Sequence, residues 1–530
     1  MHYRPASRRA ILVSSITIFI LISATFHYTI SSHGILIPTP PTAGLPSECQ
    51  VWPDWQGSSR EYSPYKLFQG TRQQPSIGLD DVLGSPWQCL HAPSRLDRYR
   101  STPDRNWSEL KWGHVQRKCI GRKYKLASAE SKLNQAWRRP VGPKELASIT
   151  DRLSGREAVV LRAWDNYEYT EKRLAWLRSL ISEVSLHQEG RYQVFLLVNV
   201  KDPNVRLEED GDAYEQALRD YVPREFRDMA VLYNERTLKA WYPQVREHGA
   251  QDQMYQALQI FSHKFPQYDY VCQLEMDLRF TGHVHEALES ATRFARSQSR
   301  RHLWERNGAF YIPGLHGSFE NFTSAVGAEV GDGGVWGPVA TADVEPKGPK
   351  PPSRSKGAWG VGEDADLISF MPMIDPIGTN WVYEDDVYGF NEGLALPRRL
   401  AVVSVTRSSR RLLHLVSEAQ REKGQWLVSE ATLETFALLH GLKAVSVPQP
   451  VYIANDKTME KIDAEINPGP VHSKAGGHMP SILYSKQGWL MGSWWQASYW
   501  FTGEAPGQVW DTYLGGKCLP PMMIHPVKEK

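Results

Sequence analysis

The sequence predicts an α/β domain with a mainly parallel sheet flanked by helices, preceded by a single transmembrane helix and a stem. Short apolar runs rich in β-branched residues alternate with segments of helical apolar spacing, and such alternation is typical of parallel βαβ units. A separate, longer apolar run near the N-terminus predicts the membrane span. The strand-like runs are 158–164, 194–200, 229–234 and 268–278, and the helical segments are Tyr169–Leu186, Ala213–Tyr221 and Asp252–Lys264.

The N-terminal apolar run, Ile11–Ile30, contains no Asp, Glu, Lys or Arg. As a helix rising about 1.5 Å per residue it reaches roughly 30 Å, which is enough to cross a bilayer. Three arginines precede the run and the next Lys or Arg is Arg60, so residues 1–10 are expected in the cytosol and the rest in the lumen. A cleaved signal peptide is the alternative, but such peptides are shorter and end at small residues, unlike the bulky Phe26–Tyr28.

The rest of the chain divides by composition. A Pro-rich and then polar stretch, 31–113, suits a stem and N-terminal extension that wraps onto the domain it carries. The lumenal domain is expected over 114–530. Within it, 331–357 is rich in Gly and Pro and lacks periodicity, which indicates either a mobile lid or an inserted surface loop. Further on, Ser417–Leu439 has a helical pattern and 444–453 a strand-like one.

Composition and charge narrow the class of protein. The chain is 41% hydrophobic and 23% charged, as folded proteins are, and its net charge of +2 gives no electrostatic argument for a nucleic-acid partner. Sequons at Asn106 and Asn321 fit lumenal exposure and glycosylation. Cys272 lies in an apolar strand pattern and is expected to be a buried free thiol. The other four cysteines allow three pairings, between which the sequence does not choose: Cys49, Cys89, Cys119 and Cys518.

The segment Tyr268–Arg279 is a nearly continuous apolar strand that ends in Glu275 and Asp277. Side chains two residues apart on a strand point to the same side. Hard divalent cations such as Mg or Mn take oxygen ligands and share them with substrate phosphates, so this pair suits a metal–nucleotide complex. The alternative is an ordinary solvated turn at a strand end.

A second acidic cluster follows in Trp359-Gly-Val-Gly-Glu-Asp-Ala-Asp366, where a Gly-rich turn leads into three carboxylates. An E-x-D strand end followed by such a segment resembles the inverting glycosyltransferases of the GT-A fold, a Rossmann-like architecture. The region 159–500 also resembles a fungal family known mainly as a domain of unknown function. That second resemblance is carried by LEMDLRFTGH, GEDADLISFMP, the PRR at 397–399 and HGLKAVSVPQPVY.

The GT-A resemblance implies roles for these carboxylates. Asp277 would bridge a metal ion to the donor, and Glu275 stands in place of the usual first Asp. Asp364 would be the base that accepts the proton of the acceptor hydroxyl, and Glu363 would orient the acceptor. The alternative is that Glu363 and Asp364 cap a helix that begins just after them. The residues expected to support this machinery are Asp366 and Arg279.

The resemblance also implies a downstream His as a further metal ligand. His478 is the candidate because Gly476 and Gly477 would let the backbone approach a phosphate, although a loop His is more often a surface residue. Arg162 and Asp165, at the end of the first strand, are expected near the nucleotide unless they merely end the strand. The pairs Trp494–Trp495 and Tyr499–Trp500 are either sugar-stacking faces or core packing, and core packing is preferred.

These features predict a metal-dependent glycosyltransferase that uses Mn or Mg to move a sugar from a nucleotide-sugar donor to an acceptor hydroxyl, with inversion. The acceptor is a glycan, protein, lipid or small molecule. The anchor, stem and lumenal domain predict a single-pass type II glycoprotein of the Golgi or endoplasmic reticulum membrane. Two rivals remain: an inactive GT-A-like protein that binds glycans or partners, and a metal-dependent hydrolase, which would normally need more closely spaced His and Asp ligands.

Overall fold

The predicted membrane anchor, 11–30, lies outside the residues that the structure describes. The computed structural model describes 47–52, 62–64, 75–85, 88–124, 156–188, 191–352, 357–377, 379, 381–403, 405–453, 457–467, 496–517 and 519–529. Among these residues no helix combines the length and the apolarity needed to cross a bilayer.

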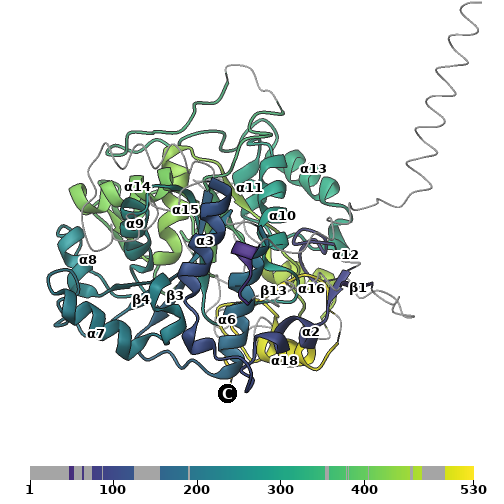
Figure 1. Ribbon diagram of the computed structural model, residues 1–530. Helices are drawn as coiled ribbons and strands as arrows, with labels where there is room; N and C mark the ends of the chain where they lie inside the picture. Colours follow the sequence, from purple (N-terminus) through teal and green to yellow (C-terminus); the bar gives the residue numbers. More distant parts are fainter. Residues whose placement is uncertain are drawn as a thin grey trace, which may run out of the picture. The chain divides into compact units, whose positions relative to one another are not determined.

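A seven-stranded sheet in the order β12-β8-β10-β6-β3-β4-β5 organises the described residues (Figure 1). Every neighbouring pair in it is parallel except the two pairs that β10 makes, so the predicted mainly parallel sheet is confirmed. The central strand β3 is buried along most of its length, as expected for a strand with helices on both faces. The strands are β3 Arg156–Trp164, β4 Tyr192–Asn199, β5 Ala230–Tyr233, β6 Tyr268–Glu275, β8 Leu367–Ser369, β10 Thr406–Ser409 and β12 Ala444–Ser446.

Helices cover both faces of this sheet. The chain moves from β3 through β4 to β5 on one side and then returns to place β6 on the other side of β3. Right-handed crossovers therefore put the helices of these two halves on opposite faces. On one face α6 packs against α10, and on the other α14 packs against α9 and α15. These helices are α6 Glu171–Val184, α7 Gly211–Tyr221, α8 Glu235–Trp241, α9 Met254–Lys264, α10 Val284–Ser297, α14 Arg410–Glu418 and α15 Ser429–His440.

Side-chain caps set where several of these helices begin. Thr170 accepts a hydrogen bond from the Arg173 backbone at the start of α6, Asp210 caps α7 and Asn234 caps α8. Such caps satisfy amide groups that have no partner inside the helix. The three helices predicted between strands are α6, α7 and α9, and each begins within two residues of its predicted position.

The helical pattern over Ser417–Leu439 is not one helix. α14 ends at Glu418, a π-helical turn follows over Ala419–Lys423, and Gly424 takes a left-handed conformation with φ +62°. The short strand β11, Trp426–Leu427, then pairs with β9, Val387–Tyr388, before α15 begins. Glycine adopts positive φ without the steric cost that other residues incur, so the chain turns here.

The described part of the predicted stem packs onto the domain. Trp107 stacks on Trp112 with ring centroids 6.0 Å apart, and the Arg178 guanidinium of α6 lies 4.6 Å from the Trp107 ring. A disulfide joins Cys49 to Cys119, which chooses among the pairings left open above. Cys272 is a buried free thiol, as predicted. The elements of this region are β1 Tyr62–Pro64, β2 Gln88–Leu90, α2 Ala92–Leu96 and α3 Trp112–Tyr124.

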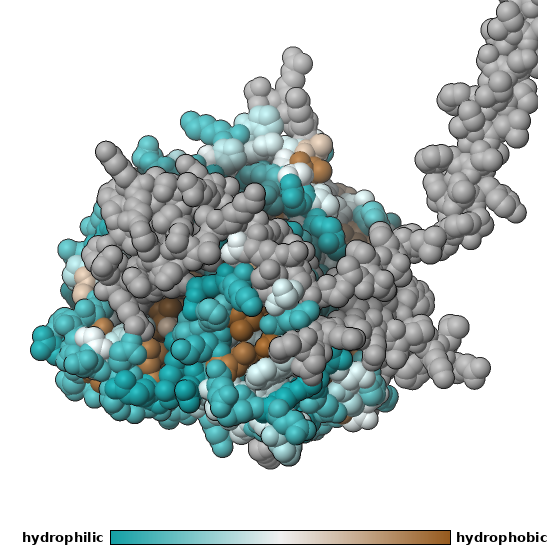
Figure 2. Space-filling view, viewed as in Figure 1, coloured by the Kyte–Doolittle hydropathy of each residue, from teal (hydrophilic) through white to brown (hydrophobic). Residues whose placement is uncertain are grey.

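The Gly- and Pro-rich segment, described over 331–352, contains no helix or strand in that range and lies against the last turn of α15. Gly348 donates to the His440 carbonyl at 2.8 Å, and Val339 donates to the Leu438 carbonyl at 3.3 Å. These bonds favour the surface-loop alternative over a mobile lid. The face seen in Figure 2 is mainly hydrophilic, with apolar residues visible in recessed patches between polar side chains.

Further helices and two short strands complete the described fold. They are β7 Arg279–Phe280, α11 Leu303–Asn307, α12 Pro313–His316, α13 Phe319–Val330, α16 Met459–Ile466, α18 Ala505–Leu514 and β13 Met523–Ile524. Tyr499 and Trp500 are buried in the core, so the preferred interpretation of that aromatic pair is confirmed. Trp494 and Trp495 lie outside the described residues.

Candidate functional site

The carboxyl ends of β3 and β6 meet where the strand order reverses. β4 lies on one side of β3 and β6 on the other, and Arg162 of β3 pairs in register with Glu275 of β6. In open α/β sheets, ligands bind beyond the carboxyl ends of the strands at such a reversal. The fold therefore directs attention to the residues around Glu275.

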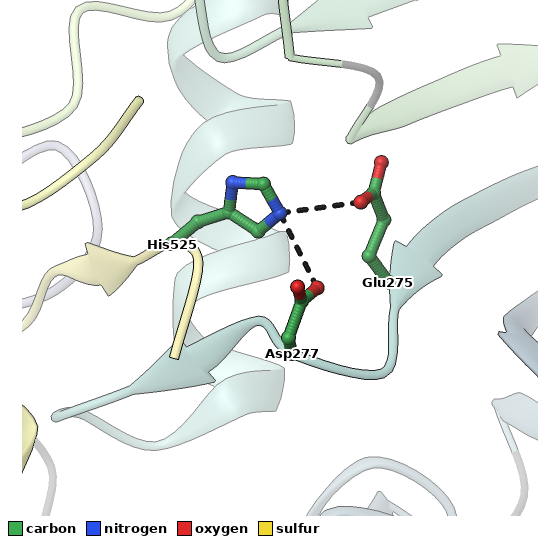
Figure 3. Close-up of side chains that lie close together, drawn as sticks. All are labelled: Glu275, Asp277 and His525. Carbon is green, nitrogen blue, oxygen red and sulfur yellow. Dashed lines mark hydrogen bonds and ion pairs between the residues drawn. The ribbon is translucent and has the colours of Figure 1, made fainter. Parts of the chain in front are cut away.

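Three side chains come together there: Glu275 at the end of β6, Asp277 in the turn that follows, and His525 just after β13 (Figure 3). His525 Nε2 lies 3.2 Å from Glu275 Oε2 and 3.3 Å from Asp277 Oδ1. One ligand atom from each residue falls within 4.8 Å of the others. His525 is buried, and the two carboxylates are partly exposed, so the cluster opens to solvent on the carboxylate side.

Neighbouring charges lower the pKa of Glu275 and raise the pKa of His525. Burial alone would raise the pKa of Glu275, but Arg162, whose guanidinium lies 2.9 Å away, and His525 lower it to about 2. Burial alone would lower the pKa of His525, but hydrogen bonds to Asp277 and Glu275 raise it to about 10. At neutral pH the imidazole therefore carries a proton that a divalent cation would displace.

Hydrogen bonds from Arg279 and the Val527 backbone fix the turn that carries Asp277. Arg279 of β7 is fully buried, donates to the Met276 and Leu278 carbonyls at 2.8 and 2.9 Å, and lies over the Trp176 ring at 4.4 Å. The Val527 backbone also donates to the Asp277 carbonyl at 2.8 Å. Arg279 thus has the supporting position that the sequence predicted.

The donor set fits a hard divalent cation. Mg and Mn prefer carboxylate oxygens, and imidazole is a common additional ligand for Mn-like transition metals. His525 presents Nε2 to the carboxylates because its Nδ1 lies 2.6 Å from the Trp500 carbonyl, which fixes the orientation of the ring. Glu275, Asp277 and His525 are therefore the residues that could hold the metal.

Several buried polar atoms around this cluster have no hydrogen-bond partner among the described residues. They are Arg162 Nε, Tyr499 Oη and Glu430 Oε2. The charge of Glu275 raises the pKa of Tyr499 and of Glu430 in addition to the effect of burial, which places both groups near that carboxylate. Buried polar groups are almost always satisfied, so these atoms have hydrogen-bonding capacity for water or a polar ligand.

Of the other residues predicted for this site, the structure brings Arg162 to the cluster but gives Asp165 a different partner. Asp165 accepts a hydrogen bond from the Lys201 backbone at 2.8 Å, and so joins the ends of β3 and β4. Asp165 therefore ends its strand, which was the alternative to nucleotide binding. Arg162 instead lies beside Glu275. His478 lies outside the described residues. His525 was not predicted, since its only sequence signal is the short apolar run Met522–Ile524 before it.

The second acidic cluster lies at the opposite edge of the sheet. Leu367, the first residue of β8, pairs with Ser408 of β10, and Ser408 pairs with Val271 of β6. Two successive antiparallel pairings make β8 run in the same direction as β6, so Asp364 precedes the amino-terminal edge. Glu275 lies four residues beyond Val271, toward the carboxyl-terminal edge. At roughly 3.3 Å per residue, Glu275 is about 13 Å from Val271 along β6.

The prediction that Asp364 shares a cleft with Asp277 is therefore wrong, and so is its assignment as the base of a reaction there. Asp364 instead lies 3.4 Å from the Arg296 guanidinium on the exposed surface. Glu363 forms a bidentate pair with Arg300 at 2.6 and 2.8 Å. Although burial opposes it, this arginine lowers the pKa of Glu363.

Asp366 also belongs to this distant edge. Its carboxylate accepts from the Ser409 hydroxyl at 2.7 Å and from Arg411 at 2.6 Å. The residues after it form β8 and not a helix, so the helix-cap alternative is also wrong. The segment is a structural junction: it ties the start of β8 to β10 and α14.

Both sequons are exposed. Asn106 caps a 3-10 turn, Trp107–Glu109, and Asn321 lies in the first turn of α13. A mainly apolar pocket lies elsewhere, beside the carboxyl ends of β8 and β12. No Asp, Glu, His or Cys lines it, so it offers none of the side chains that usually bind metal ions.

A family model described as "Protein of unknown function (DUF3405)" matches residues 62–529. No curated protein and no solved structure matches the chain.

Proposed function

The chain belongs to the DUF3405 family of proteins of unknown function, and we propose that it is a metal-dependent glycosyltransferase using a nucleotide-sugar donor. One observation carries the proposal: Glu275, Asp277 and His525 converge at the strand ends where an α/β sheet binds its ligand. Two carboxylates and an imidazole form a donor set for one divalent cation, Mn or Mg, with room for ligand oxygens on the solvent side.

The chemistry follows from charge. A divalent cation bound here would neutralise the diphosphate leaving group of a nucleotide-sugar. Arg162 offers an unpaired Nε–H beside the same carboxylate and would hold a phosphate or ribose oxygen. The LEMDLR sequence at the end of β6 is the part of the GT-A resemblance that this site supports, and the Trp-Gly-x-Gly-Glu-Asp part is not used.

The compartment is proposed from independent features. Residues 11–30 would anchor the chain as a type II protein of the Golgi or endoplasmic reticulum membrane. The Cys49–Cys119 disulfide supports an oxidising lumen, and the exposed Asn106 and Asn321 are accessible for glycosylation. The acceptor would be a glycan, protein, lipid or small molecule, and the balanced charge argues against nucleic acid.

Thermal unfolding of the full-length chain with nucleotide-sugars tests the proposal. UDP-glucose, UDP-N-acetylglucosamine and GDP-mannose are each added with Mn²⁺ or with chelator. A binding donor at 100 times its Kd stabilises the folded state by about 2.7 kcal/mol, and chelation should remove that gain. Asp277→Asn should abolish the shift. Asp364→Asn is the matched control, because it changes the same residue type at the other edge of the sheet.

The outcomes separate the rival functions. If no donor stabilises the wild type with Mn²⁺, or if Asp277→Asn and Asp364→Asn behave alike, the donor site is refuted. Donor binding without release of nucleoside diphosphate on any acceptor would favour the inactive binding protein. Release of phosphate from phosphoesters, without donor binding, would favour the hydrolase.

A further inference from the structure

The first turn of α15 lies at the same edge of the sheet as the metal-binding cluster, and Glu430 is its second residue. The Ser429 hydroxyl fixes this turn, since it donates to the Gln251 carbonyl at 2.7 Å and accepts from the Met254 backbone at 2.8 Å. Both partners lie where the chain enters α9, the helix that precedes β6. A short connection joins α9 to β6, so the start of α9 lies near the end of β6, at Glu275.

Charged groups from several elements surround the Glu430 carboxyl. It interacts electrostatically with Glu275 of β6, Arg162 of β3, Asp252 just before α9, and Tyr383. Burial, opposed by a hydrogen bond to its own backbone and aided by Glu275, raises the pKa of Glu430 to about 7. A carboxyl with this pKa takes up and releases a proton near neutral pH.

The Glu430 carboxylate also has unused hydrogen-bonding capacity. Its Oε2 is buried and accepts no hydrogen bond from any described residue. Residue Glu430 as a whole is only partly buried, so a ligand can reach it. A buried, unpaired carboxylate oxygen is suited to accept a hydrogen bond from a hydroxyl group, whereas an anionic group would be repelled by it.

We propose that Glu430 is the general base that takes the proton from the acceptor hydroxyl, in the role that the sequence had assigned to Asp364. The inference rests on the proposed function and extends it. The acceptor O–H bond breaks and its proton passes to the Glu430 carboxylate. The oxygen lone pair forms the new bond to the anomeric carbon, while the bond from that carbon to the phosphate oxygen breaks and its electrons leave with the nucleoside diphosphate.

Glu434, one turn further along α15, provides the matched control. Burial raises the pKa of Glu434 as well, and its Oε2 is also unpaired among the described residues. The charges that act on Glu434 do not include those of Glu275 or Arg162. The two residues thus share helix and residue type, although Glu434 is the more deeply buried. They differ in that only Glu430 interacts with Glu275 and Arg162.

The experiment uses the full-length chain with Mn²⁺ and whichever nucleotide-sugar stabilises it. Release of nucleoside diphosphate is measured for wild type, Glu430→Gln, Glu430→Asp and Glu434→Gln across pH 5 to 9. Removing a general base lowers rates by about 10² to 10⁴-fold. Glu430→Gln should therefore lose about 100-fold or more in turnover while its thermal shift with donor matches that of the wild type. The wild-type and Glu434→Gln rates should rise with pH as Glu430 loses its proton, and Glu430→Gln should lose this rise.

Glu430→Asp keeps a carboxylate and should retain more activity than Glu430→Gln, which also guards against a folding defect in the amide variant. Turnover of Glu430→Gln within threefold of Glu434→Gln, or an unchanged pH profile, would overturn the assignment alone. Loss of the donor-induced thermal shift in Glu430→Gln would also overturn it, because Glu430 would then bind the donor. Absence of that shift in the wild type would refute the donor site itself and this inference with it.

Discussion

His525 Nε2 lies 3.2 Å from Glu275 Oε2, although 250 residues separate the two in the chain. The contact brings the end of β13 to the end of β6 and completes, with Asp277, the three-residue group that we propose as the metal ligands. Neither carboxylate alone distinguishes a metal site from a solvated turn. The buried imidazole makes the difference, since its orientation is fixed from behind by the Trp500 carbonyl.

Removal of the imidazole should weaken metal binding. His525→Ala deletes one of three ligands, and we expect the affinity of the full-length chain for Mn²⁺ to fall at least about tenfold, since even outer partners of a metal site contribute 10 to 100-fold. Titration calorimetry measures this. His114→Ala, on the exposed face of α3, should bind Mn²⁺ as the wild type does. Equal affinities in the two variants would exclude His525 as a ligand.

The buried pair between Arg407 and Glu157 should be essential for stability. Arg407 donates to both carboxylate oxygens at 2.8 Å, and each side chain is 4% exposed. Arg407→Met leaves Glu157 charged and unpaired, which should cost about 3–5 kcal/mol in the free energy of unfolding. Adding Glu157→Gln should recover part of that loss in denaturant titrations. A double variant no more stable than the single one would contradict this account.

The disulfide should stabilise the folded protein by restricting the unfolded chain. Cys49 and Cys119 are 70 residues apart, and closing a loop of that size restricts the unfolded state by about 4 kcal/mol in the chain-entropy account. The Cys49→Ala/Cys119→Ala chain should therefore unfold at clearly lower denaturant concentration. The slope of the transition should rise, because the unfolded chain without the bond is less compact and exposes more surface. An unchanged midpoint would mean that the bond adds nothing to stability.

Glu434 should make stability depend on pH. Because burial raises its pKa well above 4.5 in the folded state, the unfolded state ionises first as pH rises. Stability is then lost from about pH 4.5 upward through the folded-state pKa. Glu434→Gln should match the wild type near pH 4 and exceed its unfolding temperature at pH 8. Glu418 is the exposed last residue of α14, and the unfolding temperature of Glu418→Gln should follow that of the wild type at both pH values. Parallel curves for Glu434→Gln and wild type would refute the effect.

Local patterns predicted the half of the sheet that is made of long apolar strands. β3, β4, β5 and β6 and the helices between them follow from hydrophobic periodicity, because their side chains are buried regularly. β10 has the sequence TRSS and is nonetheless fully buried, since Arg407 is neutralised by Glu157 across the sheet. Hydrophobic periodicity therefore cannot predict a strand such as β10.

The site was predicted in part for a similar reason. The paired carboxylates at the end of β6 and Arg162 were found because a strand end is a local feature. Asp364 was misplaced because its position depends on the register of β8 against β10 and β6, which a local motif does not contain. His525, and Glu430 in the role that we propose for it, were missed because each lies on an element distant in sequence from β6.

The long interval between β12 and His525 has a consequence for biosynthesis. All seven strands of the sheet have been translated by Ser446, whereas the imidazole arrives about 80 residues later. At 5–20 residues per second this is a delay of roughly 4 to 16 s before the proposed metal site can be complete. A ribosome-bound chain arrested within that interval would have only two of the three proposed ligands.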